Sequence, residues 1–255
     1  MEFTYKAYEN LLHILKETGY EFTNYRNWHD KEKCVILRHD IDFDVEKSLR
    51  LAEIEKNIGV KSTYFVLTTS DFYNVFSKKT DTLLQSIMAC GHEIGLHFDE
   101  VRYPGSEIGE IKSKIIDECN LLGSAIGKNV KTVSMHRPSK TILNANIQIP
   151  GIINSYGVEY FKEFKYLSDS RRIWREPVME IIYSGQFERL HILTHAFWYG
   201  ESEQNLHSSL LRYINSGNIN RYSIMDENFT RLADEVCADE ILGWDEQNGR
   251  GNKKE

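Results

Sequence analysis

The chain has 255 residues, a length that fits one α/β barrel-like domain or two small domains. Its 41% apolar residues, which include 14 Tyr, 12 Phe and 4 Trp, are enough for a sizeable core and argue against global disorder. The net charge of −7 leaves no broad basic surplus to neutralise phosphates, so we expect no nucleic acid among its partners.

The sequence contains no signal that would direct it to a membrane or out of the cell. No apolar run approaches the ~20 residues that cross a bilayer, and the N-terminal residues lack the basic and apolar regions of a signal peptide. The four cysteines are scattered without a CxxC pair, and we interpret them as reduced thiols. We therefore expect a cytoplasmic protein without a membrane span, and its oligomeric state stays open.

Helices and strands are expected to alternate along the chain. Apolar residues at helical spacing predict helices at 3–18, 44–58, 80–90, 106–126 and 201–215. Short apolar runs rich in β-branched residues predict strands at 34–39, 62–67, 92–97, 131–135 and 189–194. Residues 150–180 are less regular, with short apolar pieces and a polar run.

This alternation predicts a parallel sheet with right-handed crossovers. Chain length and repeat number favour an α/β barrel over an open sheet. We expect a single domain over residues 1–247, followed by a polar tail at 248–255.

Carboxylates cluster directly after the first strand. Residues i and i+2 of an extended segment point the same way, so Asp40 and Asp42 can face one pocket. Two adjacent carboxylates repel each other unless a cation or a proton lies between them, which indicates a metal ligand next to a general base. Asp44 is expected only to cap the helix that follows.

Further polar side chains follow other strands. His97 follows the third strand, His136 and Arg137 follow the fourth, and His195 follows the last. In a parallel barrel the strand ends all meet at one face. A carboxylate with imidazoles suits Zn²⁺, Co²⁺, Ni²⁺ or Fe²⁺. A second carboxylate could take a proton from water, a histidine could protonate a leaving group, and an arginine could hold the base ionised.

These residues resemble the motifs of the NodB-homology polysaccharide deacetylases, carbohydrate esterase family 4, in the divergent branch whose first motif is Arg-His-Asp-x-Asp. The resemblance covers roughly residues 34–200. The five segments that are similar to the family's motifs, in order, are 38–42, 91–97, 136–138, 168–171 together with Trp174, and 193–195.

The resemblance implies a distorted, NodB-like (β/α) barrel of about seven parallel strands. It also implies that Asp40 is the general base, with Arg137 holding it in position, and that His195 is the catalytic acid. Asp42 and His97 are implied to be metal ligands.

One departure from the family pattern concerns the third ligand. The family's second metal histidine lies four residues after the first, and that position here is Val101. His136 could supply the third ligand from the next strand end, or Asp99 or Glu100 could do so, or metal binding could be weakened or lost. An imidazole suits a zinc-like site best, which favours His136.

The remaining candidates concern substrate contacts. Trp198 and Tyr199 are predicted to contact a sugar ring, with lining of the core as the alternative. Asp169 is predicted to contribute to the same site, with a surface bridge to Arg171 as the alternative. His39, His92 and His191 are interpreted as structural.

The site residues together with this resemblance therefore predict a metal-dependent hydrolase that removes an N-acyl group, in the first place acetyl, from an amino-sugar in a small molecule or glycan. The expected cofactor is one divalent ion, with zinc preferred over cobalt, nickel or iron. A nucleotide- or lipid-linked sugar of surface-polysaccharide biosynthesis would fit. The alternatives are a non-catalytic barrel that binds carbohydrate or serves as a scaffold, and a hydrolase for another C–N bond.

Overall fold

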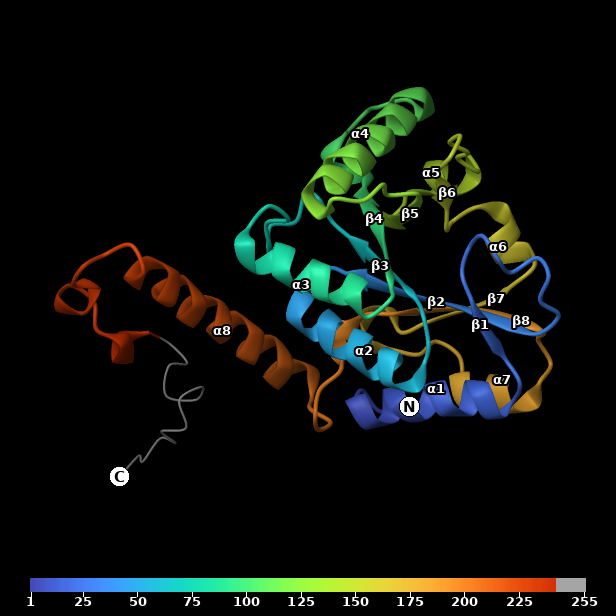
Figure 1. The fold of residues 1–255 in the computed structure, drawn as a ribbon, viewed down its shortest axis with the longest axis horizontal. Helices are drawn as coiled ribbons and strands as arrows, with labels where there is room; N and C mark the ends of the chain where they lie inside the picture. Colours follow the sequence, from blue (N-terminus) through green and yellow to red (C-terminus); the bar gives the residue numbers. More distant parts are fainter. Residues whose placement is uncertain (242–255) are drawn as a thin grey trace. The chain divides into compact units, whose positions relative to one another are not determined.

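A computed structural model describes residues 1–241 (Figure 1). The chain divides by its contacts into two compact units, Met1–Ser202 and a second that begins at Glu203. The contacts thus separate the chain after Ser202, whereas the sequence was expected to form a single domain to residue 247. The predicted boundary at 247 and the tail at 248–255 lie outside the described residues.

The first unit is built on a parallel sheet. Its strands are β1 (Glu21–Thr23), β2 (Cys34–Ile41), β3 (Thr63–Val66), β4 (Glu93–Asp99), β5 (Thr132–His136), β6 (Ile153–Asn154), β7 (Lys165–Ser168) and β8 (Arg189–Thr194). Seven of them follow one another in the order β6-β5-β4-β3-β2-β8-β7, while β1 pairs with the first half of β2. Every pairing is parallel, which confirms the expected distorted (β/α) barrel.

Helices cover the outside of this sheet. They are α1 (Tyr5–Glu17), α2 (Val45–Ile58), α3 (Lys78–Ala89), α4 (Ile108–Ile126), α5 (Lys140–Asn144), α6 (Val158–Lys162) and α7 (Val178–Ser184). The larger ones follow one another around the sheet as α7, α1, α2, α3 and α4, each in contact with the next (Figure 1).

The two faces of β2 show why this sequence forms a barrel. Val35 and Leu37 pack outward against the apolar stripe of α1, whereas Cys34 and Ile36 pack inward with aromatic side chains of the barrel interior. Because side chains alternate along a strand, the inward face continues through Arg38 to Asp40. The order of residues on β2 therefore carries the acids from the core to the carboxyl end of the barrel.

The turn after β2 follows the expected helix chemistry. The Asp44 side chain accepts a hydrogen bond from the Lys47 backbone N–H, as an N-cap does, and α2 ends at Gly59 in the left-handed region with φ 75°. Both features were predicted from the sequence and are confirmed.

The irregular stretch from 150 to 180 contains β6, α6, β7 and the start of α7, none of which was predicted. The two strands there have only two and four residues, too few to show a period of two. Their strand character comes from pairing with β5 and β8.

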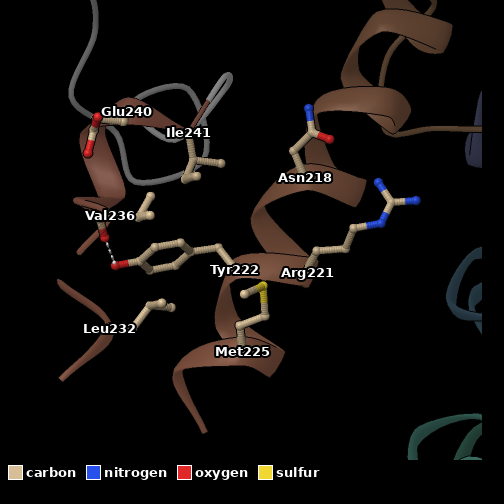
Figure 2. A pocket seen from close by; sticks show the side chains of 8 residues that line it. All are labelled: Asn218, Arg221, Tyr222, Met225, Leu232, Val236, Glu240 and Ile241. Carbon is tan, nitrogen blue, oxygen red and sulfur yellow. Dashed lines mark hydrogen bonds between the residues drawn. The ribbon is translucent and has the colours of Figure 1, made fainter. Parts of the chain in front are cut away.

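The second unit contains α8 (Leu206–Asp226), which is longer than the predicted helix at 201–215 and starts after the N-cap Asn205. Two short 3₁₀ turns follow, η4 (Leu232–Asp234) and η5 (Ala238–Glu240). A mainly apolar cavity of about 280 Å³ lies between α8 and these turns. Figure 2 shows the side chains that line it, among which Tyr222 donates a hydrogen bond to the Val236 carbonyl. None of the predicted site residues lines this cavity.

Within residues 1–241, no helix combines the length and apolar character needed to cross a bilayer.

Candidate metal and catalytic site

The predicted metal ligands converge at the carboxyl end of the barrel. Asp42 follows β2, His97 lies near the end of β4, and His136 ends β5. His97 and His136 are neighbours because β4 pairs with β5, in a register that sets Asp99 opposite His136. The curvature of the sheet brings the acid after β2 to the same place, although β3 lies between β2 and β4.

The three side chains form a nearly equilateral triangle of ligand atoms. Asp42 Oδ1 lies 3.3 Å from His97 Nε2 and 3.3 Å from His136 Nδ1, and the two nitrogens are 3.0 Å apart. Ligands about 2.0–2.2 Å from one ion stand about 3.0 Å apart at neighbouring octahedral positions and about 3.3 Å apart in a tetrahedron. The donor set therefore fits a single divalent ion.

The surroundings of this triangle also fit a cation. Asp42 Oδ1 is buried and accepts no hydrogen bond within the described part of the chain, which is a cost that a bound cation would remove. Burial alone would raise the pKa of Asp42, but the facing His136 and His97 side chains lower it well below its usual range. Two imidazoles and one carboxylate are ligands suited to zinc-like and iron-like ions.

Asp99 and Glu100, the other candidates for the third ligand, are engaged in other contacts. The Asp99 carboxylate accepts from the Arg137 guanidinium at 2.5 Å, and the Glu100 carboxylate accepts from the Ser139 backbone N–H at 2.8 Å. Val101, at the family's usual histidine position, is 61% exposed. His136 is therefore the third side chain that the structure places at this point.

Asp40, the predicted base, lies beside this triangle. Its Oδ2 is 3.7 Å from His97 Nε2 and accepts a hydrogen bond from Arg38 Nη2 at 2.8 Å. Burial alone would raise the pKa of Asp40, but the Arg38 guanidinium and the His97 imidazole lower it below its usual value. Asp40 is thus held as a carboxylate, the form that a base requires.

The predicted contact between Arg137 and Asp40 is wrong. Arg137 pairs with Asp99, its side chain is 63% exposed, and its backbone takes a left-handed φ of 51°. The arginine that contacts Asp40, the predicted base, is Arg38. The i, i+2 rule that places Asp40 and Asp42 on one face also places Arg38 on that face, so this signal was available in the sequence.

His195, the predicted acid, is positioned by a buried carboxylate. Asp169 Oδ1 lies 2.6 Å from His195 Nδ1, and both Asp169 oxygens accept from the His195 backbone N–H. Burial alone would lower the pKa of His195, but the hydrogen bond and charge of Asp169 raise it to about 9. The second ring nitrogen, His195 Nε2, faces away from Asp169 and lies 3.9 Å from Asp42 Oδ2.

Asp169 therefore contributes to the site by orienting a histidine, and not through a contact of its own with substrate. It is fully buried after β7, which pairs with β8 and so lies next to the strand that carries His195. It neither forms a surface bridge to Arg171 nor lies open to a substrate. The sequence offered no local signal, because 26 residues separate the partners.

The two predicted aromatic contacts have different positions. Tyr199 is fully buried and donates a hydrogen bond from its hydroxyl to Asp169 Oδ2, so the prediction that it contacts substrate is wrong. Trp198 is half-buried, with its ring 6.4 Å from the His195 ring. Its contact with a sugar stays a prediction.

The remaining histidines of the barrel are structural, as interpreted. His39 points away from the site, with Nε2 2.6 Å from the buried Glu55 carboxylate. His92 is hydrogen-bonded to backbone groups through both ring nitrogens. His191 pairs with the Tyr25 hydroxyl at 2.9 Å, and burial keeps its pKa well below the usual value.

No protein-family model matches this sequence, and no curated protein matches it. Among solved structures it is similar to a family 4 carbohydrate esterase from Streptococcus mutans, with 18% identity over 77% of this chain and 84% of that one, at a TM-score of 0.48. It is also similar to a family 4 acetyl xylan esterase from Clostridium thermocellum in complex with a cobalt ion, with 17% identity over 64% and 73% of the two chains, at 0.42. A family 4 pseudoenzyme from Bacillus anthracis has 16% identity over 74% and 61%, also at 0.42.

Proposed function

We propose that this protein is a metal-dependent hydrolase that removes an N-acyl group, in the first place acetyl, from an amino-sugar. The observation that carries the proposal is the convergence of Asp42, His97 and His136 next to a buried carboxylate and an Asp-oriented histidine. Hydrolysis of an amide needs a proton acceptor for water and a proton donor for the departing nitrogen. Both kinds of group lie beside the ligand triangle.

Each of these residues would have a separate role in the hydrolysis. Asp42, His97 and His136 would hold the ion, which when bound would polarise the amide carbonyl and acidify a water molecule. Asp40 takes a proton from the attacking water molecule as the oxygen of that water bonds to the acyl carbon. His195 gives its proton to the nitrogen as the C–N bond breaks, which releases a carboxylic acid and an amine.

The electrostatics suit these two roles. Arg38 keeps Asp40 ionised, and Asp169 raises the pKa of His195 to about 9, so that the imidazole is protonated at neutral pH when no ion is bound. A base that is free of its proton and an acid that carries one are the starting states that the reaction requires.

We propose zinc as the ion, because two imidazoles and a carboxylate are a familiar zinc ligand set. Cobalt, nickel and iron are alternatives with the same ligands. An amino-sugar of surface-polysaccharide biosynthesis as substrate and a cytoplasmic location stay predictions.

Metal binding and acetate release test the proposal together. Metal-free protein is titrated with Zn²⁺ or Co²⁺ while the melting temperature and bound metal are measured. At about 100 times Kd the ion should stabilise the fold by about 2.7 kcal/mol, with one ion per chain. The loaded protein should then release acetate from N-acetylglucosamine oligosaccharides.

Variants identify the ligands. Asp42→Asn, His97→Ala and His136→Ala should each lose the ion and the shift in melting temperature. Asp99→Asn and Glu100→Gln, which alter the two rejected ligands, should keep both. If His136→Ala still binds one ion and Asp99→Asn does not, the ligand set is wrong. If the protein binds the metal tightly and binds an amino-sugar but releases acetate from none, the result would favour the non-catalytic alternative.

A further inference from the structure

Arg38 is a cation enclosed in the barrel interior. Its side chain is fully buried on the inward face of β2. Nη2 donates to Asp40 Oδ2 and Nη1 donates to Ser155 Oγ, both at 2.8 Å. The guanidinium also lies over the Tyr156 ring, 5.0 Å from its centroid, and 5.4 Å from that of Phe65.

A buried charge is retained only where it is paired, because desolvation is costly. Within the described part of the chain, Asp40 is the carboxylate in ion-pair contact with Arg38. The second hydrogen-bond partner of Arg38, Ser155, lies directly after β6, so the arginine also connects β2 to a strand at the far edge of the sheet. Arg38 is thereby held from both sides while it holds Asp40.

The contact leaves the two oxygens of Asp40 in different states. Oδ2 receives the Arg38 hydrogen bond, whereas Oδ1 is buried and has no hydrogen-bond donor within residues 1–241. Buried carboxylate oxygens normally accept a hydrogen bond. Within the described residues Oδ1 of Asp40 has none and lies next to the ligand triangle, so it is available to a molecule that binds there. A fixed contact on one oxygen also fixes the direction of the other.

We infer that Arg38 is the positioning residue of Asp40. Arg38 holds Oδ2 of Asp40 in place, so that Oδ1 of Asp40 is the atom that accepts the proton of water. This rests on the proposed function, because it gives Asp40 the role of base. It assigns to the residue two places before the base a task that Arg137, paired with Asp99, does not perform.

A stability cycle tests the contact without any assay of activity. Arg38→Met, Asp40→Ala and the double variant are melted as metal-free proteins. Each single change leaves one buried charge unpaired and should lower the melting temperature by more than about 5 °C, while the double variant should lose at least about 5 °C less than the sum. Arg137→Met combined with Asp40→Ala should be additive within about 2 °C, as expected for groups that share no contact.

Kinetics on the metal-loaded protein test the role. With an N-acetylglucosamine oligosaccharide, Arg38→Met should lower kcat by about 100-fold with KM within about 3-fold and bound metal unchanged. In the Asp40→Ala background the same change should alter the residual kcat by less than about 2-fold. Arg189→Met, which removes an arginine from β8 that pairs with Glu163, should leave kcat unchanged.

The outcomes separate the inference from the function. Additive melting temperatures for Arg38 and Asp40 would overturn the inference whatever the activity. Coupled melting temperatures in a protein that releases no acetate would sink the proposed function and leave the contact standing. If Arg38→Met does not fold, Arg38→Lys keeps one charged donor for Asp40, and we expect it to retain kcat within about 10-fold. If Arg38→Lys lowers kcat and the loss persists in the Asp40→Ala background, Arg38 does not act through Asp40 and only stabilises the fold.

Discussion

The sharpest prediction for the fold concerns Glu55, a fully buried carboxylate on the inner side of α2. Its Oε1 accepts from the Tyr8 hydroxyl and from His39 Nε2, and its Oε2 accepts from the Ser62 and Tyr64 hydroxyls at 2.7 and 2.9 Å. Four donors thus converge on one carboxylate behind the strand that carries the site. We expect Glu55→Gln to be strongly destabilising.

Two routes lead to a similar magnitude. The glutamine amide turns an NH₂ group toward two donors, and the loss of two hydrogen bonds to a charged acceptor costs roughly 3–6 kcal/mol. Independently, burial alone would raise the pKa of Glu55, but His39 and the other partners lower it to about 2 from 4.5. That depression corresponds to roughly 3 kcal/mol of stability. A loss of roughly 3 kcal/mol, on which both routes agree, should lower the melting temperature of a unit of this size by about 6–12 °C.

The pH dependence follows from the direction of the shift. A carboxylate whose pKa is lower in the folded state stabilises the fold above its unfolded pKa, near 4.5, and this contribution is lost as the pH falls through about 2. The difference between wild type and Glu55→Gln should therefore be largest at neutral pH and shrink as the pH drops below about 4.5.

Thermal unfolding followed by circular dichroism from pH 7 to pH 3 measures both effects. Glu53→Gln is the matched control, because Glu53 is on the same helix but 48% exposed, with Arg50 3.5 Å away. It should shift stability by less than about 0.5 kcal/mol. A Glu55→Gln protein as stable as this control, or a difference that does not change with pH, would refute the reasoning.

Two further predictions concern single positions. Asp169→Asn should lower the pKa of His195 from about 9 toward 6.5, as followed by NMR titration of the metal-free protein. It should also remove the stability that the pair contributes at neutral pH and loses as the pH rises through about 9. We expect kcat to fall by about 10- to 100-fold, and an unchanged titration would contradict the pairing. Gly95→Ala places a Cβ 2.5 Å from the Phe65 ring and should destabilise the protein by about 1–3 kcal/mol in chemical denaturation. Gly109→Ala, which meets nothing within 4 Å, should be neutral or slightly stabilising, and equal effects of the two changes would argue against this packing.

Much of the fold was accessible from local patterns. Alternation along β2, the Asp44 cap and the Gly59 terminus each depend on residues close together in the chain. Strand ends that carry polar side chains were recognisable for the same reason. The two short strands β6 and β7 were missed because their pairing, and not their composition, makes them strands.

The partners within the site were a different problem. Arg38 and Arg137 both stand near a strand end, and only packing shows that one is enclosed with Asp40 while the other pairs with Asp99. Tyr199 was predicted to contact substrate, yet the fold buries it against Asp169. Residues of similar type were separated by burial, which the local sequence does not encode.

The sequence by itself determined that acids and histidines stand at the ends of parallel strands, because strand period and helix caps are properties of adjacent residues. Only the tertiary structure decided which of them meet. His136 reaches His97 because β5 pairs with β4, and Asp169 reaches His195 because β7 pairs with β8. Asp42 joins the first pair because the sheet curves. Strand order, register and curvature are set by the packing of the whole barrel, and so the third ligand that Val101 does not supply comes from a neighbour in space, 39 residues away from His97 in the chain.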